Sequence, residues 1–223
     1  MATVDQIGTS WPADLPDRIL LHGIPWELYE VLREDEANWH VRMAYDDGEL
    51  ELMSPSQRHG SIEFRFGLFL IALASGLGFK CKPLGKTTWK KAGSKKGKEA
   101  DGCFYLENYE RVRHKEIDLD LDPPPDLAIE VEISQSAINA LSIYAALGVP
   151  EIWRFDGATF HIHRRQPDGS YLELERSEAL PFLIPGEVVE WMIRGEEEDD
   201  DVEWSQQVHE WARVELVRRL RPL

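Results

Sequence analysis

The chain has 223 residues, 43% of them hydrophobic, with eight tryptophans and a net charge of −16. This length and composition suit one well-buried domain with an appendage, and the acidity argues against a simple nucleic-acid binder. Because the sequence holds no apolar run of about 18 residues, no leader-like segment and only two cysteines, we expect no membrane span, no signal peptide and a cytoplasmic location.

The charge is unevenly distributed along the chain. Residues 196–203 contain seven acids, whereas residues 80–98 contain eight lysines and no acid. A local basic patch of this kind can bind phosphates although the total charge is negative. The alternative interpretation is a solvated loop, the usual state of a charge run. The candidate nucleic-acid contacts in this stretch are Lys90, Lys91, Lys95, Lys96 and Lys98.

In chain order, residues 1–18 are polar and rich in proline, so we expect a loosely ordered lead-in. A short helix follows, and then a β-hairpin over 40–53, because an Asp-Gly pair separates two alternating runs. A long helical pattern covers residues 56–77 behind a serine cap. On this helix His59 and Glu63 are four residues apart and therefore share a face.

The middle of the chain is predicted to form strands on either side of a lysine-rich tip. An interrupted strand covers residues 79–89, glycines punctuate the lysine segment 90–98, and a continuous strand over 99–106 carries Asp101. Residues 108–122 are a charged connection. The lysine tip directly precedes Asp101, which favours phosphate contact over the solvated-loop interpretation.

Residues 126–133 alternate apolar and acidic side chains, as a half-buried strand does. Glu130 and Glu132 are two apart and are expected to point the same way. The acids either form a solvated face or mark a site for a hard divalent cation such as Mg²⁺, which keeps neighbouring carboxylates ionised. A helix over 136–147 and a strand over 151–155 follow, which predicts a parallel strand-helix-strand unit with a right-handed crossover.

The C-terminal third contains a predicted hairpin over 159–174, in which His161 and His163 share a strand face but lack a third metal ligand. An amphipathic helix over 202–221 ends the chain and either caps the domain or pairs two protomers into a homodimer. The apolar side of this helix consists of Trp204, Val208 and Trp211. The expected division of the chain is a lead-in (1–18), a main domain (19–190), and an acidic linker with the terminal helix (191–223).

Several separated motifs resemble one known family. They are AYDDGELELMSPSQRHG, EADGCFY, PPPDLAIEVEIS and YAALGVPEIWRFD, and they occur in the family's order over roughly residues 19–183. The sequence resembles the Uma-two family, described as putative restriction endonucleases within the PD-(D/E)XK nuclease superfamily. This resemblance implies a restriction-endonuclease-like α/β (α+β) fold: a mixed sheet flanked by helices, with peripheral hairpins and a C-terminal helix.

The resemblance also implies roles for individual residues. Asp101 and Glu130 match the two metal-ligand positions, and Glu132 follows at the next site of the motif. The metal would be Mg²⁺ or Mn²⁺, and the substrate DNA. A glutamate of the first core helix can assist, which here is Glu63, and His59 matches a recurrent histidine. Ala100 stands where the family usually has a proline, which is not a ligand.

The expected catalytic lysine is missing from both of its usual places. Position 132 is a glutamate, and the family's alternative lysine position on the following helix is Ala140. Lys98 and Arg154 are the nearest basic candidates. Either one of them substitutes, or the chain binds without cutting, or Ala140 is an engineered inactivation.

We therefore predict a magnesium-dependent endonuclease of weak or lost activity. The alternatives are a non-catalytic interaction or nucleic-acid-binding module that keeps the fold, and a metal-binding protein without a nucleic-acid role.

Overall fold

Two β-sheets meet where the chain passes through Ala100 and Asp101. The structure, a computed structural model, describes residues 18–220, so the predicted lead-in lies outside the described residues apart from Arg18. The smaller sheet is antiparallel, with the strand order β1 (Arg18–Leu21), β3 (Glu49–Met53), β2 (Arg42–Asp46), β6 (Lys96–Glu99), β5 (Thr88–Lys91). The larger, mixed sheet has the order β11 (Tyr171–Leu174), β10 (Phe160–Arg165), β9 (Glu151–Phe155), β8 (Leu127–Val131), β7 (Gly102–Tyr105), β4 (Lys82–Pro83).

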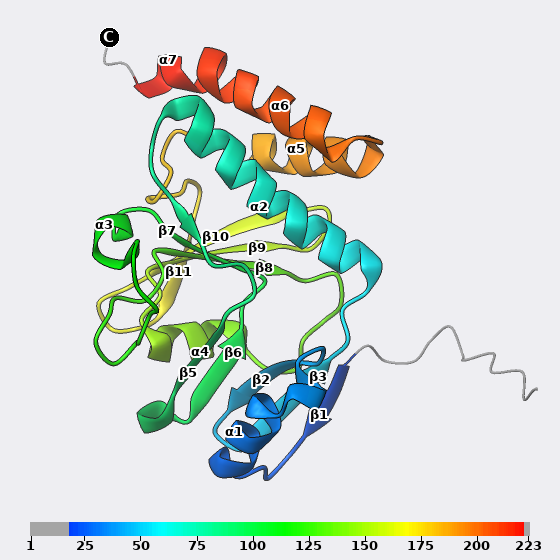
Figure 1. Cartoon of the computed structure of the whole chain (residues 1–223), viewed down its shortest axis with the longest axis vertical. Helices are drawn as coiled ribbons and strands as arrows, with labels where there is room; N and C mark the ends of the chain where they lie inside the picture. The colour runs from blue at the N-terminus through cyan, green and yellow to red at the C-terminus, as the bar shows by residue number, and fades with distance from the viewer. Residues whose placement is uncertain (1–17, 221–223) are drawn as a thin grey trace, which may run out of the picture.

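Helices cover both faces of the larger sheet (Figure 1). The long helix α2 (Gln57–Leu77) lies across one face, backed by α5 (Pro185–Glu197) and α6 (Asp201–Trp211), and α4 (Ala140–Leu147) lies against the other. The fold class expected from the sequence, a mixed sheet flanked by helices, is therefore confirmed. By length and composition α2 could also cross a membrane, but here it is the central helix of the core.

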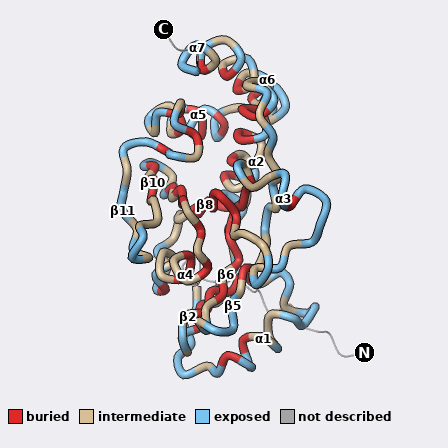
Figure 2. The backbone as a smooth tube through the Cα atoms, turned by 90° about the vertical axis from the view of Figure 1, so that its left-hand side faces the viewer, coloured by how far each residue is buried: buried red, intermediate tan, exposed pale blue. Residues whose placement is uncertain are grey.

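Strand β8 lies at the centre of the core, and Figure 2 shows this strand as a continuous buried segment. Leu127, Ile129 and Val131 pack toward α2, whereas Ala128 packs toward α4. Both faces are buried, so the solvated-face interpretation of the acids on this strand does not hold. The predicted parallel pairing of β8 with β9 is confirmed, and the structure places Leu127 opposite Glu151.

Helix α4 begins later than predicted. Its first residue is Ala140 rather than Ser136, and the Asn139 side chain caps it by accepting a hydrogen bond from Leu141 N at 3.1 Å. Ser136 does not continue the helix because its hydroxyl donates to Glu51 Oε1 at 2.8 Å. The segment 132–139 is consequently a loop tied to the smaller sheet.

The predicted continuous strand over 99–106 is divided between the two sheets. Strand β6 ends at Glu99 and β7 begins at Gly102, so Ala100 and Asp101 form the crossing point. The predicted hairpin of β2 and β3 is confirmed, and α1 (Trp26–Glu34) packs Trp26 and Tyr29 onto it. The charged connection contains only a short helix, α3 (Tyr109–Val112).

The C-terminal segment is part of the main core. Helix α5 was not predicted, and it spans the expected boundary at residue 190. The acidic tract ends α5 and begins α6, where Asp200 accepts from Val202 N at 2.8 Å as a cap. After α6 come a π-helical turn (Ala212–Leu216) and α7 (Val217–Leu220). Because Trp204 and Val208 are both 0% exposed, the apolar stripe proposed for dimer formation is occupied by the chain's own core.

Candidate active site

A small buried cavity lies at the crossing point of the two sheets. It has room for about one water-sized particle, at ≈ 20 Å³, and its wall combines acids and bases from both sheets and from α2. The charged or titratable residues that line it are Arg18, Arg42, Glu51, His59, Lys98, Glu99, Asp101 and Glu130. Two predicted ligands, Asp101 and Glu130, thus reach the same cavity.

Asp101 is 5% exposed and is held by contacts on both carboxylate oxygens. Its Oδ2 accepts a hydrogen bond from Val131 N at 2.7 Å, and its Oδ1 lies 3.1 Å from His59 Nε2 and contacts Arg42. The strand break at residues 100–101 frees the side chain from the regular alternation of a sheet. Asp101 can therefore turn into the cavity while its backbone joins the two sheets.

Helix α2 contributes His59 and Glu63 from adjacent turns, and Arg42 on β2 contacts both. One ligand atom each from His59, Glu63 and Asp101 lie within 4.8 Å of one another. Burial, assisted by Arg42 and other nearby cations, lowers the pKa of His59 to about 4, so its imidazole is neutral at pH 7. Burial raises the pKa of Glu63, against the opposing effect of the Arg42 and Lys86 charges.

The carboxylate of Glu130 is contacted by a lysine and a tyrosine. The ammonium Nζ of Lys98 lies 3.0 Å from Glu130 Oε2, and the hydroxyl of Tyr144 donates to Oε1. Burial, followed by the nearby Glu130 charge, raises the pKa of Tyr144 well above its usual value, so the phenol keeps the proton that it donates. Lys98, on the neighbouring sheet, thus reaches the place where a catalytic lysine is expected.

Glu132 does not join these residues. Strand β8 ends at Val131, so the side-chain alternation that would align Glu132 with Glu130 stops there. Glu132 instead pairs with Arg154, with Nη2 and Oε2 at 2.5 Å, at a separate pocket beside the loop 132–140. The first acid of the alternating run is structural, since Asp126 accepts from Leu106 N at 2.7 Å and from Asn108 N at 2.9 Å.

Four charged residues in the cavity wall are new relative to the sequence-based site: Arg18, Arg42, Glu51 and Glu99. Arg42 contacts the His59–Glu63–Asp101 group, and Arg18 pairs with Glu51 at 2.6 Å. Glu51 also accepts from Ala137 N at 2.7 Å, which ties the loop before α4 to the smaller sheet. An arginine on a short alternating strand carries no sequence signal of its own, and only the burial of β2 makes Arg42 informative.

The lysine-rich hairpin is largely engaged within the protein. Lys90 pairs with Glu34 at 2.7 Å and Glu30 at 3.3 Å, Lys96 contacts Asp46, and Lys98 contacts Glu130. Lys91 and Lys95 are exposed at the tip, and within residues 18–220 neither forms an ion pair. Of the five candidate phosphate contacts, these two are the ones presented to solvent without a competing carboxylate.

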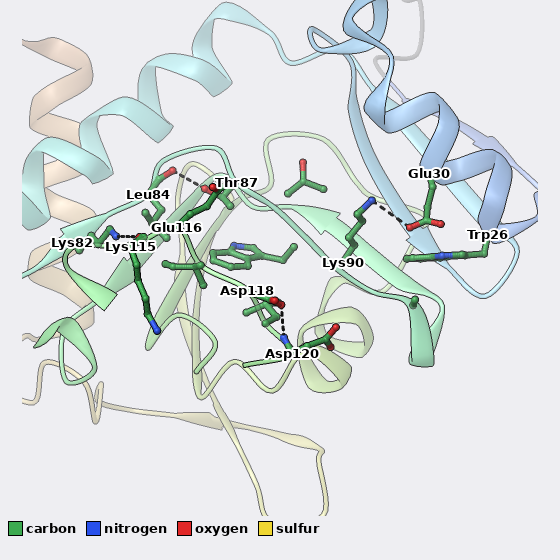
Figure 3. Close-up of a pocket in the computed structure, with 15 residues that line it drawn as sticks. Trp26, Glu30, Lys82, Leu84, Thr87, Lys90, Lys115, Glu116, Asp118 and Asp120 are labelled. Carbon is green, nitrogen blue, oxygen red and sulfur yellow. Dashed lines mark hydrogen bonds and ion pairs between the residues drawn. The ribbon is translucent and has the colours of Figure 1, made fainter. Parts of the chain in front are cut away.

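A broader pocket of ≈ 810 Å³ lies on another side of the hairpin (Figure 3). Glu30 and Lys90 line one end, and Lys82 with the loop 115–120 lines the other. Its acids outnumber its bases, and it shares no residue with the Asp101 cavity. Size alone therefore does not single out the small cavity in which Asp101 and Glu130 meet.

The donor set at the junction suits a divalent cation. A neutral imidazole nitrogen and two carboxylates lie within reach of one another, and the Nδ1 atom of His59 is buried without a partner among the described residues. Oxygen ligands suit Mg²⁺ and Mn²⁺, and the imidazole makes Mn²⁺ the better match. Glu130 borders the small cavity together with His59 and Asp101 but is not among the three donors grouped within 4.8 Å.

Comparisons with known proteins give one family and one named structural neighbour. The family model described as "Putative restriction endonuclease" (Uma2) matches residues 26–195. A crystal structure of a putative nuclease belonging to DUF820 from Anabaena variabilis has 14% sequence identity and a TM-score of 0.49, covering 83% of this chain and 99% of that one. No curated protein matches.

Proposed function

The chain belongs to the Uma2 family of putative restriction endonucleases, whose model matches residues 26–195, and on this premise we propose that the Asp101 cavity hydrolyses phosphodiester bonds in DNA. The observation that carries the proposal is the convergence of Asp101, Glu130 and Lys98 on one cavity. These are two buried carboxylates and an ammonium, brought together from two sheets. Such a group can hold a cation and assist an attacking water.

Asp101, Glu63 and His59 would hold the divalent ion, with Glu130 as a further donor. When bound, Mg²⁺ or Mn²⁺ polarises the phosphate and makes a bound water more acidic. The protein's own contribution is positional. Val131 N fixes Asp101, and Tyr144 fixes one oxygen of Glu130. Lys98 Nζ, at 3.0 Å from the other oxygen, is placed to orient the water and to offset negative charge in the transition state.

Lys98 also offers a replacement for the catalytic lysine that is missing at position 140. Ala140 is the first residue of α4, one turn before Tyr144, whose hydroxyl reaches Glu130. The ammonium that a lysine at position 140 would bring is thus supplied by Lys98 from β6. Arg154 is the weaker substitute because it pairs with Glu132 outside the cavity. We therefore propose an active enzyme in which the lysine has moved to another strand.

The rival is a non-catalytic module that keeps the fold. It is favoured by one observation, that Arg42 and Lys86 already neutralise Glu63 and Asp101. A cytoplasmic location also remains a proposal, based on the free thiols of Cys81 and Cys103. Dimer formation remains a prediction without an assigned surface, because the stripe on α6 is buried in the core.

The test uses a matched pair of acids two residues apart. We expect Glu130→Gln to abolish cleavage of plasmid DNA in Mg²⁺ or Mn²⁺, and Glu132→Gln, whose partner is Arg154, to retain most of it. Both exchanges remove one charge and keep the side-chain shape. If the unmodified chain cleaves no DNA in either ion, the endonuclease proposal fails. Equal losses in the two variants would place the site elsewhere.

A further inference from the structure

The three donors suited to a divalent ion share a single partner, the guanidinium group of Arg42. Its Nη1 contacts Asp101 Oδ1 and lies 3.4 Å from His59 Nε2, and its Nη2 contacts Glu63 Oε2. Arg42 is 6% exposed, so this positive charge is held inside the protein. It reaches the cluster from β2, a strand of the smaller sheet.

We propose that Arg42 is a built-in counter-cation that holds the metal position, and that a divalent ion enters only by displacing it. The inference rests on the proposed metal-dependent function and adds to it a mechanism that limits metal loading. A guanidinium and a metal ion both require the Asp101 and Glu63 oxygens, and Arg42 already contacts one oxygen of each carboxylate.

The charge balance leads to the same conclusion. Asp101 and Glu63 carry two negative charges, and Arg42 and Lys86 supply two positive ones, with Lys86 Nζ 3.6 Å from Glu63 Oε2. A divalent ion added without displacement would leave two uncompensated positive charges in a desolvated site, which is strongly unfavourable. Removing the guanidinium from the carboxylates reduces that excess by one charge.

The arrangement around Arg42 is also incompletely hydrogen-bonded. Its Nε and the Nδ1 of His59 are both buried without a partner within residues 18–220. An unpaired buried donor raises the free energy of the arrangement that contains it. In the ion-free state the charges of the cluster are therefore balanced, but two buried polar atoms lack hydrogen-bond partners. This favours exchange of Arg42 for an ion.

The test measures Mn²⁺ binding by calorimetry without nucleic acid, in the unmodified chain, Arg42→Gln and Arg18→Gln. Arg18 is the matched control because it lines the same cavity and pairs with Glu51 rather than with the three donors. We expect Arg42→Gln to bind Mn²⁺ at least about tenfold more tightly, and Arg18→Gln to change affinity by less than about threefold. In EDTA, Arg42→Gln should unfold at a lower temperature, and Mn²⁺ should raise its Tm more than that of the unmodified chain.

Unchanged or weaker affinity in Arg42→Gln, or an equal gain in Arg18→Gln, overturns the displacement mechanism and leaves the endonuclease proposal standing. Absence of Mn²⁺ binding in all three proteins overturns both. Crystals of the unmodified chain soaked in Mn²⁺ give a measurement independent of the variants' folding. An ion among His59, Glu63 and Asp101 with Arg42 moved away supports the mechanism. An ion there with Arg42 still on Asp101 and Glu63 refutes it.

Discussion

Helix α2 buries apolar side chains along both halves, and only its N-terminal half adds a buried polar cluster. Its N-terminal half directs His59 and Glu63 at Arg42 and Asp101, whereas its C-terminal half packs Phe69 against Trp204 and Trp211, with ring centroids 6.5 and 6.4 Å apart. At Gly76 a Cβ atom would lie 2.6 Å from His209 O, so the glycine allows α2 and α6 to approach closely.

The difference separates stability from chemistry within one element. Buried ion pairs repay their desolvation poorly, so the polar cluster of the N-terminal half adds little net stability and is best explained by a function. Aromatic burial is strongly favourable, and it holds the helix in place. The positions of His59 and Glu63 therefore depend on the apolar contacts of the same helix, which begin at Ile62 and Phe66 and continue to its C-terminal half.

The largest expected effect comes from breaking the aromatic half. Trp204 is fully buried against Trp191 and Phe69, and its Nε1 donates to Trp191 O at 3.1 Å. We expect Trp204→Ala to lower the free energy of unfolding by about 3–5 kcal/mol. Trp39→Ala is the control, because Trp39 is 62% exposed, and it should change stability little. Urea unfolding measures both, and comparable losses would contradict the assignment of stability to the aromatic half.

The next effect comes from breaking the ion pair of Lys98 and Glu130, which lines the cavity that His59 of α2 also borders. We expect Lys98→Met to slow cleavage by about 10²–10³ and also to destabilise the fold, because Glu130 loses its cation. The double variant Lys98→Met with Glu130→Gln should recover much of the stability, since no charge is left unpaired, but none of the activity. Unfolding and cleavage assays on the same samples provide the comparison. A double variant less stable than Lys98→Met alone would show that the ion pair is a structural support.

Local patterns explain which parts of the molecule could be predicted from the sequence. Alternation identified β8 and its parallel partner β9, and the family motifs pointed to Asp101 and Glu130, which do share a cavity. The prediction for Glu132 relied on alternation continuing past Val131, where the strand in fact ends. The prediction of one strand over 99–106 missed the crossing between sheets, because sheet membership is a long-range property.

The remaining contacts join residues that are distant in sequence. Lys98 was named as a candidate from its place before Asp101, and it does reach the cavity, but its contact with Glu130 comes from another sheet. Arg42, which was not predicted, meets Glu63 across a sequence separation of 21 residues, so no local spacing reveals either contact. Helix α5 was overlooked because it begins at a proline and runs into the acidic tract, which was interpreted as a linker. Its buried residues, among them Val188 and Met192, become informative only beside α2 and the larger sheet.

A third prediction moves the catalytic ammonium group from position 98 to position 140. Ala140 is half-buried at the start of α4, four residues before Tyr144, so a lysine there would lie on the helix side from which the Tyr144 hydroxyl reaches Glu130. We expect Ala140→Lys to raise cleavage by Lys98→Met at least about tenfold, since it restores a cation near Glu130. In the unmodified chain the same change should add little, because Lys98 is already present. Lack of rescue, with metal binding intact, would favour the non-catalytic module.

The smallest expected effect concerns Lys95 at the tip of the lysine-rich hairpin. Lys95 is exposed and has a φ angle of 48°, a left-handed conformation that asparagine tolerates well, so Lys95→Asn removes the charge without straining the turn. If Lys95 contacts a DNA phosphate, this change should reduce the slope of log affinity against log salt concentration by about one unit.

Lys90→Gln is the matched control from the same hairpin. Lys90 is already paired with Glu30 and Glu34, so it should release fewer counterions and alter the slope less. Fluorescence anisotropy with a labelled duplex in Ca²⁺, across a salt series, measures both slopes. If the slope is unchanged in Lys95→Asn, the tip is a solvated loop, and binding must rest on the charges around the Asp101 cavity.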